Sequence, residues 1–448
     1  MEQTLWNACS TGDLATVKST LDQHPLVDIN WAGEDRQDSP LHRGCRFGHV
    51  DIVVALLCRA GIEVNKGNKG DASPFFIACQ ERHLAVVSLL LLDPRVDPNR
   101  PSRTDTTPFH FGCAYGHADV VRLLLADPRI DVNRGNDTGA TPFIMACQEG
   151  HVEVFTHMLA DLRVDPNRPD RDEFTPLFVA CQEGNYDIVR GLLADVRTDP
   201  NKTGTDLVTP FFMACEYGHE RVVSLFLAHR VVDLTKPNNN GATPFFIACQ
   251  NGHHPVVALM LRNPAVDHNQ PRGDQSTPLW FAAQNGRLSV VQHLLASSVE
   301  VDTRTVSNFN SRTPAAQARQ QPLVPRMLNE TDEDCRRRQT NGPTIAALID
   351  EYDVDPPAVR LRLRLVPGVR ELVARDLFAL VVFLSDNLLQ VTSKTDSLAR
   401  RFFAICAQLP LELQMVLCNR TVGSGRDLVP SRDSEVAFQQ LARDLLNP

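Results

Sequence analysis

The hydrophobic and polar residues of this chain follow one pattern that recurs along roughly its first two-thirds. Its clearest copy spans residues 243–253: Thr-Pro, the apolar run Phe-Phe-Ile-Ala-Cys, then Gln-Asn and Gly-His. From Pro40 to Pro278 the proline of this phrase returns every 34 residues. A fixed period of this length predicts a solenoid, in which each copy is one unit that cannot bury its apolar face alone.

Each copy predicts two helices and a projecting loop. A Ser or Thr precedes the proline, as at an N-cap before a first helical residue that needs no N–H, and the glycine supplies the left-handed turn that ends this helix. A second helix is indicated by apolar residues at helical spacing, such as Val120, Val121 and Leu124. It ends at a step such as Asp127-Pro128, because proline disfavours helix in the residue before it. We count nine units and a tenth remnant from Arg312.

The pattern stops near residue 319, and the rest of the chain predicts a different organisation. Residues 320–342 are polar, with two prolines and a charged run over 332–338, which predicts a linker. Residues 343–448 carry enough Leu, Val and Phe for a small helical domain, with helices expected at 344–352, 367–391, 396–408 and 434–446. Residues 359–365 alternate Val or Leu with Arg, which predicts a two-faced strand or an edge docked on the last repeat. The expected fold is all-α: a repeat solenoid over 1–319, then a helical domain.

The repeats resemble ankyrin repeats, whose consensus is Gly-x-Thr-Pro-Leu-His-x-Ala-Ala-x-x-Gly-His, then a Val/Leu-rich helix and Gly-Ala-Asp-Val-Asn. This chain departs from that consensus in three ways. Its period is one residue longer, and Asp-Pro-Arg-type linkers replace the helix-ending glycine in most units. Arg82 stands at the turn glycine, which predicts a strained or altered turn. Phe replaces the consensus His at Phe76, Phe178, Phe212 and Phe246, so that hydrogen bonds between repeats are expected to give way to aromatic packing there.

Composition narrows the setting of the protein. A formal net charge of −9 argues against a general nucleic-acid binder, no apolar run reaches the ~18 residues of a membrane span, and the first residues show no secretory signal. Most cysteines share one repeat position, where neighbouring helices lie about 8–10 Å apart, too far for disulfides. They predict packed, reduced thiols without zinc. We expect a cytoplasmic chain; the nucleus is the alternative, because Arg336 to Arg338 is either an import element or a solvated run.

No catalytic motif accompanies the repeats. The chain has no His-Glu-x-x-His element, no P-loop and no Gly-x-Ser-x-Gly elbow. The histidines of the Gly-His step recur at the repeat period and predict structural turns, not ligands. We therefore expect no enzyme, cofactor or metal; an enzyme would need its site in the region after the repeats.

What remains is surface. In ankyrin-like arrays the two residues before Gly-His face the concave groove, and exposed aromatic residues there are typical interface anchors. The resemblance thus implies a partner-binding set, with loop arginines that favour an acidic partner segment: Phe47, Glu81, Tyr115, Glu149, Glu183, Tyr217, Asn251, Arg103 and Arg171. The alternative is that the Gln and Glu residues form only a solvated stripe. The resemblance also suggests Asn133 as a site of asparagine hydroxylation.

The sequence therefore predicts a non-catalytic scaffold, expected to be monomeric, that binds a partner protein on the concave face of the array. The alternative function is an adaptor whose C-terminal helical domain links clients to a ubiquitin ligase or a signalling complex.

Overall fold

The computed structural model is an array of helix pairs, and it confirms the all-α expectation. It describes residues 1–33, 36–229, 231–297, 299–321 and 331–364, together with Val366 and Val369, and contains no strand within these ranges. By its internal contacts the chain divides into two compact units, Met1–Asn239 and Asn240–Pro448.

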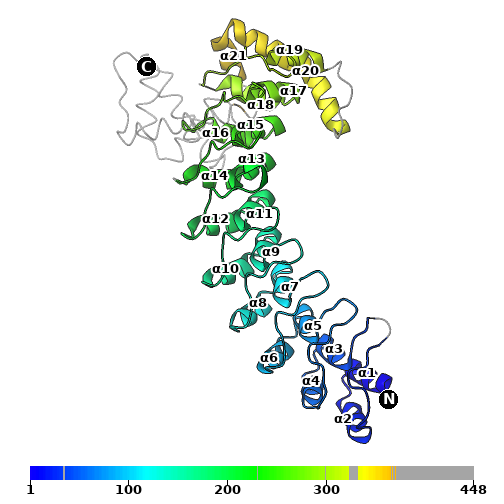
Figure 1. Ribbon diagram of the computed structural model, residues 1–448. Helices are drawn as coiled ribbons and strands as arrows, with labels where there is room; N and C mark the ends of the chain where they lie inside the picture. Colours follow the sequence, from blue (N-terminus) through cyan, green and yellow to red (C-terminus); the bar gives the residue numbers. More distant parts are fainter. Residues whose placement is uncertain are drawn as a thin grey trace, which may run out of the picture. The chain divides into compact units, whose positions relative to one another are not determined.

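The first unit holds seven repeats. In Figure 1 their first helices lie in one row and their second helices in another, and the loops between repeats project beyond the row of first helices. A short 3-10 turn, η1 (Thr205–Leu207), lies in one of these loops. The helix pairs are α1 (Glu2–Thr11) and α2 (Leu14–Gln23), α3 (Pro40–Arg46) and α4 (Val50–Leu57), α5 (Pro74–Gln80) and α6 (Leu84–Leu92), α7 (Pro108–Ala114) and α8 (Ala118–Leu125), α9 (Pro142–Glu149) and α10 (Val152–Ala160), α11 (Pro176–Glu183) and α12 (Tyr186–Ala194), and α13 (Pro210–Tyr217) and α14 (Glu220–Ala228).

The second unit continues the pattern and closes it. Its helices are α15 (Pro244–Asn251) and α16 (His254–Met260), α17 (Pro278–Gln284) and α18 (Leu288–Ala296), then α19 (Pro314–Gln320), α20 (Asp332–Val354) and α21 (Pro356–Leu363). Helix α20 packs on α17, α18 and α19, and α21 packs on α18 and α20. The nine units and the remnant are thus present, and two non-repeat helices cover the end of the array.

Capping explains where the first helices begin. In the phrase over residues 243–253, the Thr243 hydroxyl accepts a hydrogen bond from the Phe246 amide at 3.1 Å, and Pro244 is the first helical residue. Where the consensus His is kept, the imidazole also bridges repeats: His42 Nε2 lies 3.0 Å from the Ala72 carbonyl oxygen, and His110 Nε2 lies 3.2 Å from that of Ala140.

Where Phe replaces this His, rings of neighbouring repeats pack as expected at Phe76 and Phe246, whereas Phe178 stacks on a ring of its own repeat. Phe76 meets Phe111 edge-on with ring centroids 5.7 Å apart, and Phe178 stacks on Phe174 at 4.5 Å. In the second unit Phe246 meets Phe281 at 5.1 Å. Trp280 occupies the same position in the last full repeat. Its indole N–H donates to the Arg312 carbonyl at 3.0 Å and so keeps a hydrogen bond between repeats.

The turn glycine has a steric role besides its left-handed backbone. At Gly48, Gly116 and Gly184 a Cβ atom would lie within 2.7 Å of the histidine ring of the next repeat. Those rings donate to the backbone of the preceding repeat; His151 Nε2, for example, lies 2.9 Å from the Ala114 carbonyl oxygen. Arg82 occupies this position with φ +60°, so the turn keeps the left-handed conformation of the glycines and is strained, as predicted, rather than altered. The next histidine, His117, has its Nδ1 buried without a hydrogen-bond partner.

Two side-chain columns join neighbouring repeats of the first unit. In the Asn ladder each Asn side chain donates to a backbone carbonyl of the next repeat at 2.6–2.8 Å and accepts an amide there at 2.7–3.0 Å. Its members are Asn30, Asn65, Asn99, Asn133, Asn167 and Asn201. In the Arg clamp each guanidinium donates to a carbonyl near the end of the preceding repeat's second helix at 2.6–2.9 Å and pairs with the Asp two residues before it. Its members are Arg95, Arg129, Arg163 and Arg197. The clamp gives the Asp-Pro-Arg linkers their structural role.

The repeat cysteines lie in the core, as predicted. Cys9, Cys45, Cys79 and their equivalents through Cys249 are buried and form no disulfide. Burial raises the pKa of Cys9 to about 12, so this column consists of inert, protonated thiols.

Two predictions after residue 320 are wrong. Residues 332–342, predicted as linker, form the first half of α20. The Thr331 hydroxyl accepts from the Asp334 amide at 3.1 Å, and three acidic residues occupy the first turn, where the helix dipole favours them. Of the segment 359–365, predicted as a strand or an edge docked on the last repeat, residues 359–363 belong to α21, because the Asp355 carboxylate caps the Ala358 amide at 3.1 Å and Pro356 follows. The segment packs on α18 of the last repeat, but as a helix. The helices predicted at 367–391, 396–408 and 434–446 fall outside the described residues.

Candidate functional site

The structure places the predicted partner-binding residues at one position of successive repeats, the C-terminal end of the first helix. Tyr115, Tyr217 and Phe47 are 63%, 51% and 44% exposed. Glu81, Glu149 and Glu183 are exposed as well, and Asn251 occupies the same position, half-buried, in the second unit.

A pocket of about 720 Å³ opens beside Tyr115, between the first helices of three repeats and the loop before α7. Its lining residues are Phe76, Ser102, Thr104, Thr106, Phe111, Ala114, Tyr115, Met145, Glu149 and His151. We call this the aromatic pocket. Two of the predicted site residues, Tyr115 and Glu149, therefore line one cavity.

Stacked rings form the apolar side of the aromatic pocket. Phe111 lies against Tyr115 with ring centroids 4.2 Å apart and planes 25° from parallel, and it meets Phe76 edge-on. Phe76 is buried, whereas Phe111 and Met145 are half-buried. A ligand that covers apolar surface gains about 25 cal/mol of transfer free energy per Å² covered, before the entropy cost of association. The rings are therefore the part of this pocket best suited to bind.

Hydroxyl groups form the opposite wall. Ser102 Oγ lies 3.2 Å from Thr104 Oγ1, which lies 3.0 Å from Thr106 Oγ1. This loop is held by backbone hydrogen bonds, since the Ser102 amide donates to the Thr106 carbonyl at 2.9 Å. The wall can donate to and accept from a peptide without carrying charge.

The sequence interpretation missed the column that forms the floor. Phe111 and Met145 lie four residues before Tyr115 and Glu149, one helical turn back, and the same position holds Ile77, Val179 and Met213. Those three are buried. The sequence alone does not distinguish them from the half-buried Phe111 and Met145, because all five belong to apolar runs. The available signal was that the run in α7 and α9 is apolar on consecutive residues, more than one buried face of a helix uses.

The charged groups of this surface differ in their surroundings. Glu81 pairs with Arg46 at 3.0 Å, and Glu183 accepts from Gln182 Nε2 at 3.1 Å. Glu149 stands exposed at the rim of the aromatic pocket. Glu216, next to Tyr217, is half-buried, and this burial raises the pKa of its carboxyl. Carboxylates thus dominate the helix ends of the middle repeats.

The loop arginines do not form a cationic surface. The Arg103 guanidinium donates to the Lys69 carbonyl at 2.6 Å and lies 3.8 Å from the Asp71 carboxylate. Arg171 is exposed at the next-but-one loop, where its backbone amide donates to the Thr138 carbonyl at 3.0 Å. Neither arginine lines the aromatic pocket, so the sequence-based expectation of an acidic partner gains no support from their positions.

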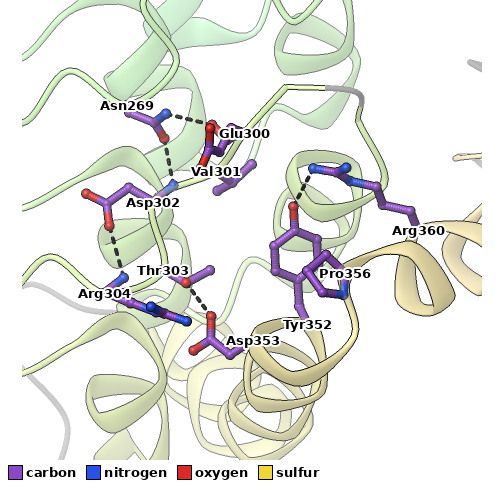
Figure 2. A pocket seen from close by; sticks show the side chains of 10 residues that line it. All are labelled: Asn269, Glu300, Val301, Asp302, Thr303, Arg304, Tyr352, Asp353, Pro356 and Arg360. Carbon is purple, nitrogen blue, oxygen red and sulfur yellow. Dashed lines mark hydrogen bonds between the residues drawn. The ribbon is translucent and has the colours of Figure 1, made fainter.

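A second pocket of about 660 Å³ lies in the second unit, where α20 and α21 meet the loop after α18 (Figure 2). Asn269 donates to the Glu300 carbonyl at 2.7 Å and accepts from the Asp302 amide at 2.9 Å. Thr303 Oγ1 donates to Asp353, and the Arg360 guanidinium donates to the Tyr352 hydroxyl at 2.7 Å. Because these polar groups bond to one another, the pocket is a junction that fixes the C-terminal helices on the last repeat.

The two buried histidines that bridge repeats are uncharged. Burial lowers the pKa of both His42 and His110 to about 4, so these imidazoles are neutral at physiological pH. In the described part of the chain, no three His, Cys, Asp or Glu side chains converge as a metal site would require.

The structure also shows the surroundings of the predicted import run, Arg336 to Arg338, and of the predicted hydroxylation site, Asn133. Arg338 is buried, 1% exposed, and donates to Gln321 Oε1 at 2.9 Å, whereas Arg337 pairs with Asp334 at 2.8 Å. The Arg336–Arg338 run therefore lies on a packed helix, where one of its three side chains is inaccessible to a receptor. Asn133 is a rung of the Asn ladder; its hydroxylation stays a prediction.

Comparison with known families agrees with this architecture. A model described as ankyrin repeats in three copies matches residues 60–136, 110–204 and 196–272, and a single ankyrin-repeat model matches residues 36–69 and 274–306. The chain has no match among curated proteins. No helix within the described ranges has the length and apolar character needed to cross a membrane. Ankyrin repeats generally mediate protein–protein interaction, and the matched stretches cover more than half of the sequence. The chain belongs to the ankyrin-repeat family.

Proposed function

We propose that this protein is a non-catalytic scaffold that holds a segment of a partner protein across the surface lined by the ends of its first helices and by the adjacent loops. We call this surface the groove. The observation that carries the proposal is the aromatic pocket, in which the exposed Tyr115 ring stacks on a half-buried Phe111 ring beside a cavity of about 720 Å³.

The aromatic pocket has the properties of an interaction hot spot. Tyr is enriched among residues that dominate binding energies, and such residues sit in pockets that a partner side chain can fill and dry. The ring stack also holds Tyr115 in place before binding, which reduces the side-chain entropy lost on association. Tyr217 offers a second exposed ring farther along the same column.

Affinity capture with the full chain tests this function. Proteins retained by the wild type are quantified against those retained by Tyr115→Ala and Phe111→Ala. We expect at least one abundant partner to be lost from both variants. A matched control is Val196→Ala, because Val196 is 99% exposed in the segment after α12 and does not line the pocket. Retention of every partner by both pocket variants would contradict the proposal.

The adaptor function remains the alternative. It depends on the C-terminal helical domain, residues 343–448, of which the structure describes 343–364 together with Val366 and Val369. Ligase or signalling subunits that co-purify with the full chain but not with a chain ending at Arg364 would support it; equal recovery from both would remove it.

A further inference from the structure

We propose that the partner segment held in the groove is basic, with one apolar side chain in the aromatic pocket and lysine or arginine residues lying along repeats five to seven. This inference rests on the proposed function and adds the chemistry of the partner.

The repeat period extends the geometry of the aromatic pocket along the array. The pocket is bounded by Tyr115 and Glu149 on the helix side and by Thr104 on the loop side. In the two repeats after Glu149 the helix-side position holds Glu183 and Tyr217. In the three repeats after Thr104 the loop-side position holds Thr138, Asp172 and Asp206. The loop side therefore changes from the neutral Thr104 beside the pocket to Asp172 and Asp206, while the helix side carries Glu149 and Glu183 before Tyr217.

The exposed charges in this part of the groove are mostly negative. At the loop tips and helix ends of repeats five to seven the exposed carboxylates are Asp137, Glu149, Asp172, Glu173, Glu183 and Asp206, and the exposed cations there are two, Arg168 and Arg171. Loop tips and helix ends both line the cavity one repeat earlier. A segment laid along the groove would therefore pass between two rows of carboxylates.

Charge complementarity decides which occupant suits this surface. Opposite potentials speed association and suppress wrong partners, whereas like charges brought together oppose binding. An acidic peptide or a nucleic acid would place its negative charges against these carboxylates. A basic segment would neutralise them, and the stacked Phe111 and Tyr115 rings present faces that also attract cations.

The lining of the aromatic pocket is the reason to expect one apolar side chain in the segment. Its floor consists of Phe76, Phe111 and Met145, with no charged group among them. The carboxylate at its rim, Glu149, lies toward repeat five. An apolar side chain in the pocket therefore leaves the neighbouring residues of the segment facing the acidic walls.

Selection from a random twelve-residue peptide library, displayed on phage and presented to the full chain, tests the proposal. We expect the enriched peptides to share one large apolar residue with two or more Lys or Arg on one side of it. A synthetic copy of the strongest peptide should bind the double variant Glu149→Lys, Glu183→Lys at least tenfold more weakly than the wild type. Its binding should also weaken as salt is raised, because surface charge is screened.

A charge-matched control separates the groove from the protein's overall charge. The double variant Glu153→Lys, Glu220→Lys makes the same change at exposed positions on α10 and α14, the second-helix row, and should bind the peptide within twofold of the wild type.

The outcomes distinguish this inference from the proposed function. Enrichment of acidic or uncharged peptides, or no enrichment at all, overturns the basic-segment proposal. If such peptides are still lost from Tyr115→Ala, the groove remains a binding surface and only the partner chemistry is wrong. Binding unchanged by Tyr115→Ala and by the Glu149 and Glu183 charge reversal removes both proposals.

Discussion

At the scale of single residues, Arg82 shows how one side chain can weaken the joint between two repeats. Its φ of +60° lies in the left-handed region, which costs a non-glycine residue about 1 kcal/mol or more. Its Cβ also occupies the space that the neighbouring glycines leave for the next histidine, and His117 is left with a buried, unpartnered nitrogen. The partial compensation is a 3.0 Å ion pair between Arg82 and Asp119.

The change Arg82→Gly should therefore stabilise the protein. We expect a gain of about 1 kcal/mol, since relief of strain and a better-placed His117 outweigh an exposed ion pair, worth about 0.2–1 kcal/mol, and the added chain entropy of glycine. Urea unfolding measures this. Arg82→Ala is the matched control: it loses the ion pair but keeps the Cβ, and should be no more stable than the wild type. Equal stability of the Gly and Ala variants would contradict the explanation.

His42 and His110 predict a pH dependence. Both have a folded-state pKa of about 4, below the unfolded value of about 6.5, because burial disfavours the charged ring. As pH falls through 6.5 the unfolded chain binds protons that the folded chain does not, so stability falls between about pH 6.5 and 4. For each histidine the loss should approach about 2 kcal/mol at pH 5.

The array supplies its own control for this effect, because other repeats carry Phe at the same position. Thermal unfolding from pH 7.5 to 4.5 should show a clearly shallower pH dependence for the double variant His42→Phe, His110→Phe. A slope identical to that of the wild type would mean that other groups cause the acid sensitivity.

At the scale of elements, the Arg clamp compensates for the missing glycine at the end of the second helices. Arg163 donates to the Leu125 carbonyl at 2.6 Å and pairs with Asp161 at 2.7 Å, while its side chain remains 37% exposed. Each clamp therefore closes the end of the preceding helix and fixes the following linker.

Removal of one clamp should have a modest, measurable cost. Arg163→Ala is expected to lower the free energy of unfolding by about 1 kcal/mol, the usual contribution of a hydrogen bond to a charged donor at a partly exposed site. Arg122→Ala, at an exposed position of α8, should change it by less than about 0.5 kcal/mol. A loss at Arg163 no larger than that at Arg122 would show that the clamp contributes nothing to stability.

The repeat helices could be predicted because their determinants are local. Thr243, Pro244 and Gly252 cap, begin and end α15 within one stretch of sequence, as their equivalents do in the other repeats. The half of α20 before residue 343 could not be predicted, since its residues are polar and their partners are distant: Asn341 donates to the Gly286 carbonyl at 2.9 Å. Tyr115 was found because an exposed aromatic breaks a polar pattern, whereas Phe111 looked like core.

At the scale of the whole molecule, the side chains that join repeats change at the end of the first unit. The position after Asn201 in the Asn ladder holds Thr235, whose hydroxyl donates to Asp233 in its own loop at 2.9 Å. The position after Arg197 in the Arg clamp holds Val231, and the equivalent acceptor, the Leu193 carbonyl, lies 3.3 Å from His229 Nε2 instead. The two compact units meet in sequence at Asn239 and Asn240, close to both interruptions.

We therefore expect the two units to unfold in separate transitions, since repeat arrays lose cooperativity where the terms between neighbours are weak. Trp280 reports on the second unit in a chain whose Trp6 and Trp31 are changed to Phe, and a Trp280→Phe chain reports on the first. Fluorescence should give two midpoints, and Arg163→Ala should shift only that of the first unit. Coincident midpoints that move together would contradict this expectation.

The central claim is that a partner protein lies in the groove against the aromatic pocket. Site-specific photo-crosslinking tests it most directly: a benzoyl-phenylalanine replaces Tyr115, or in a parallel chain Leu162, which is 86% exposed in the segment after α10 and outside the pocket. We predict that position 115 crosslinks a partner protein in cells and position 162 does not. A partner captured from position 162 but not from position 115 would contradict the account.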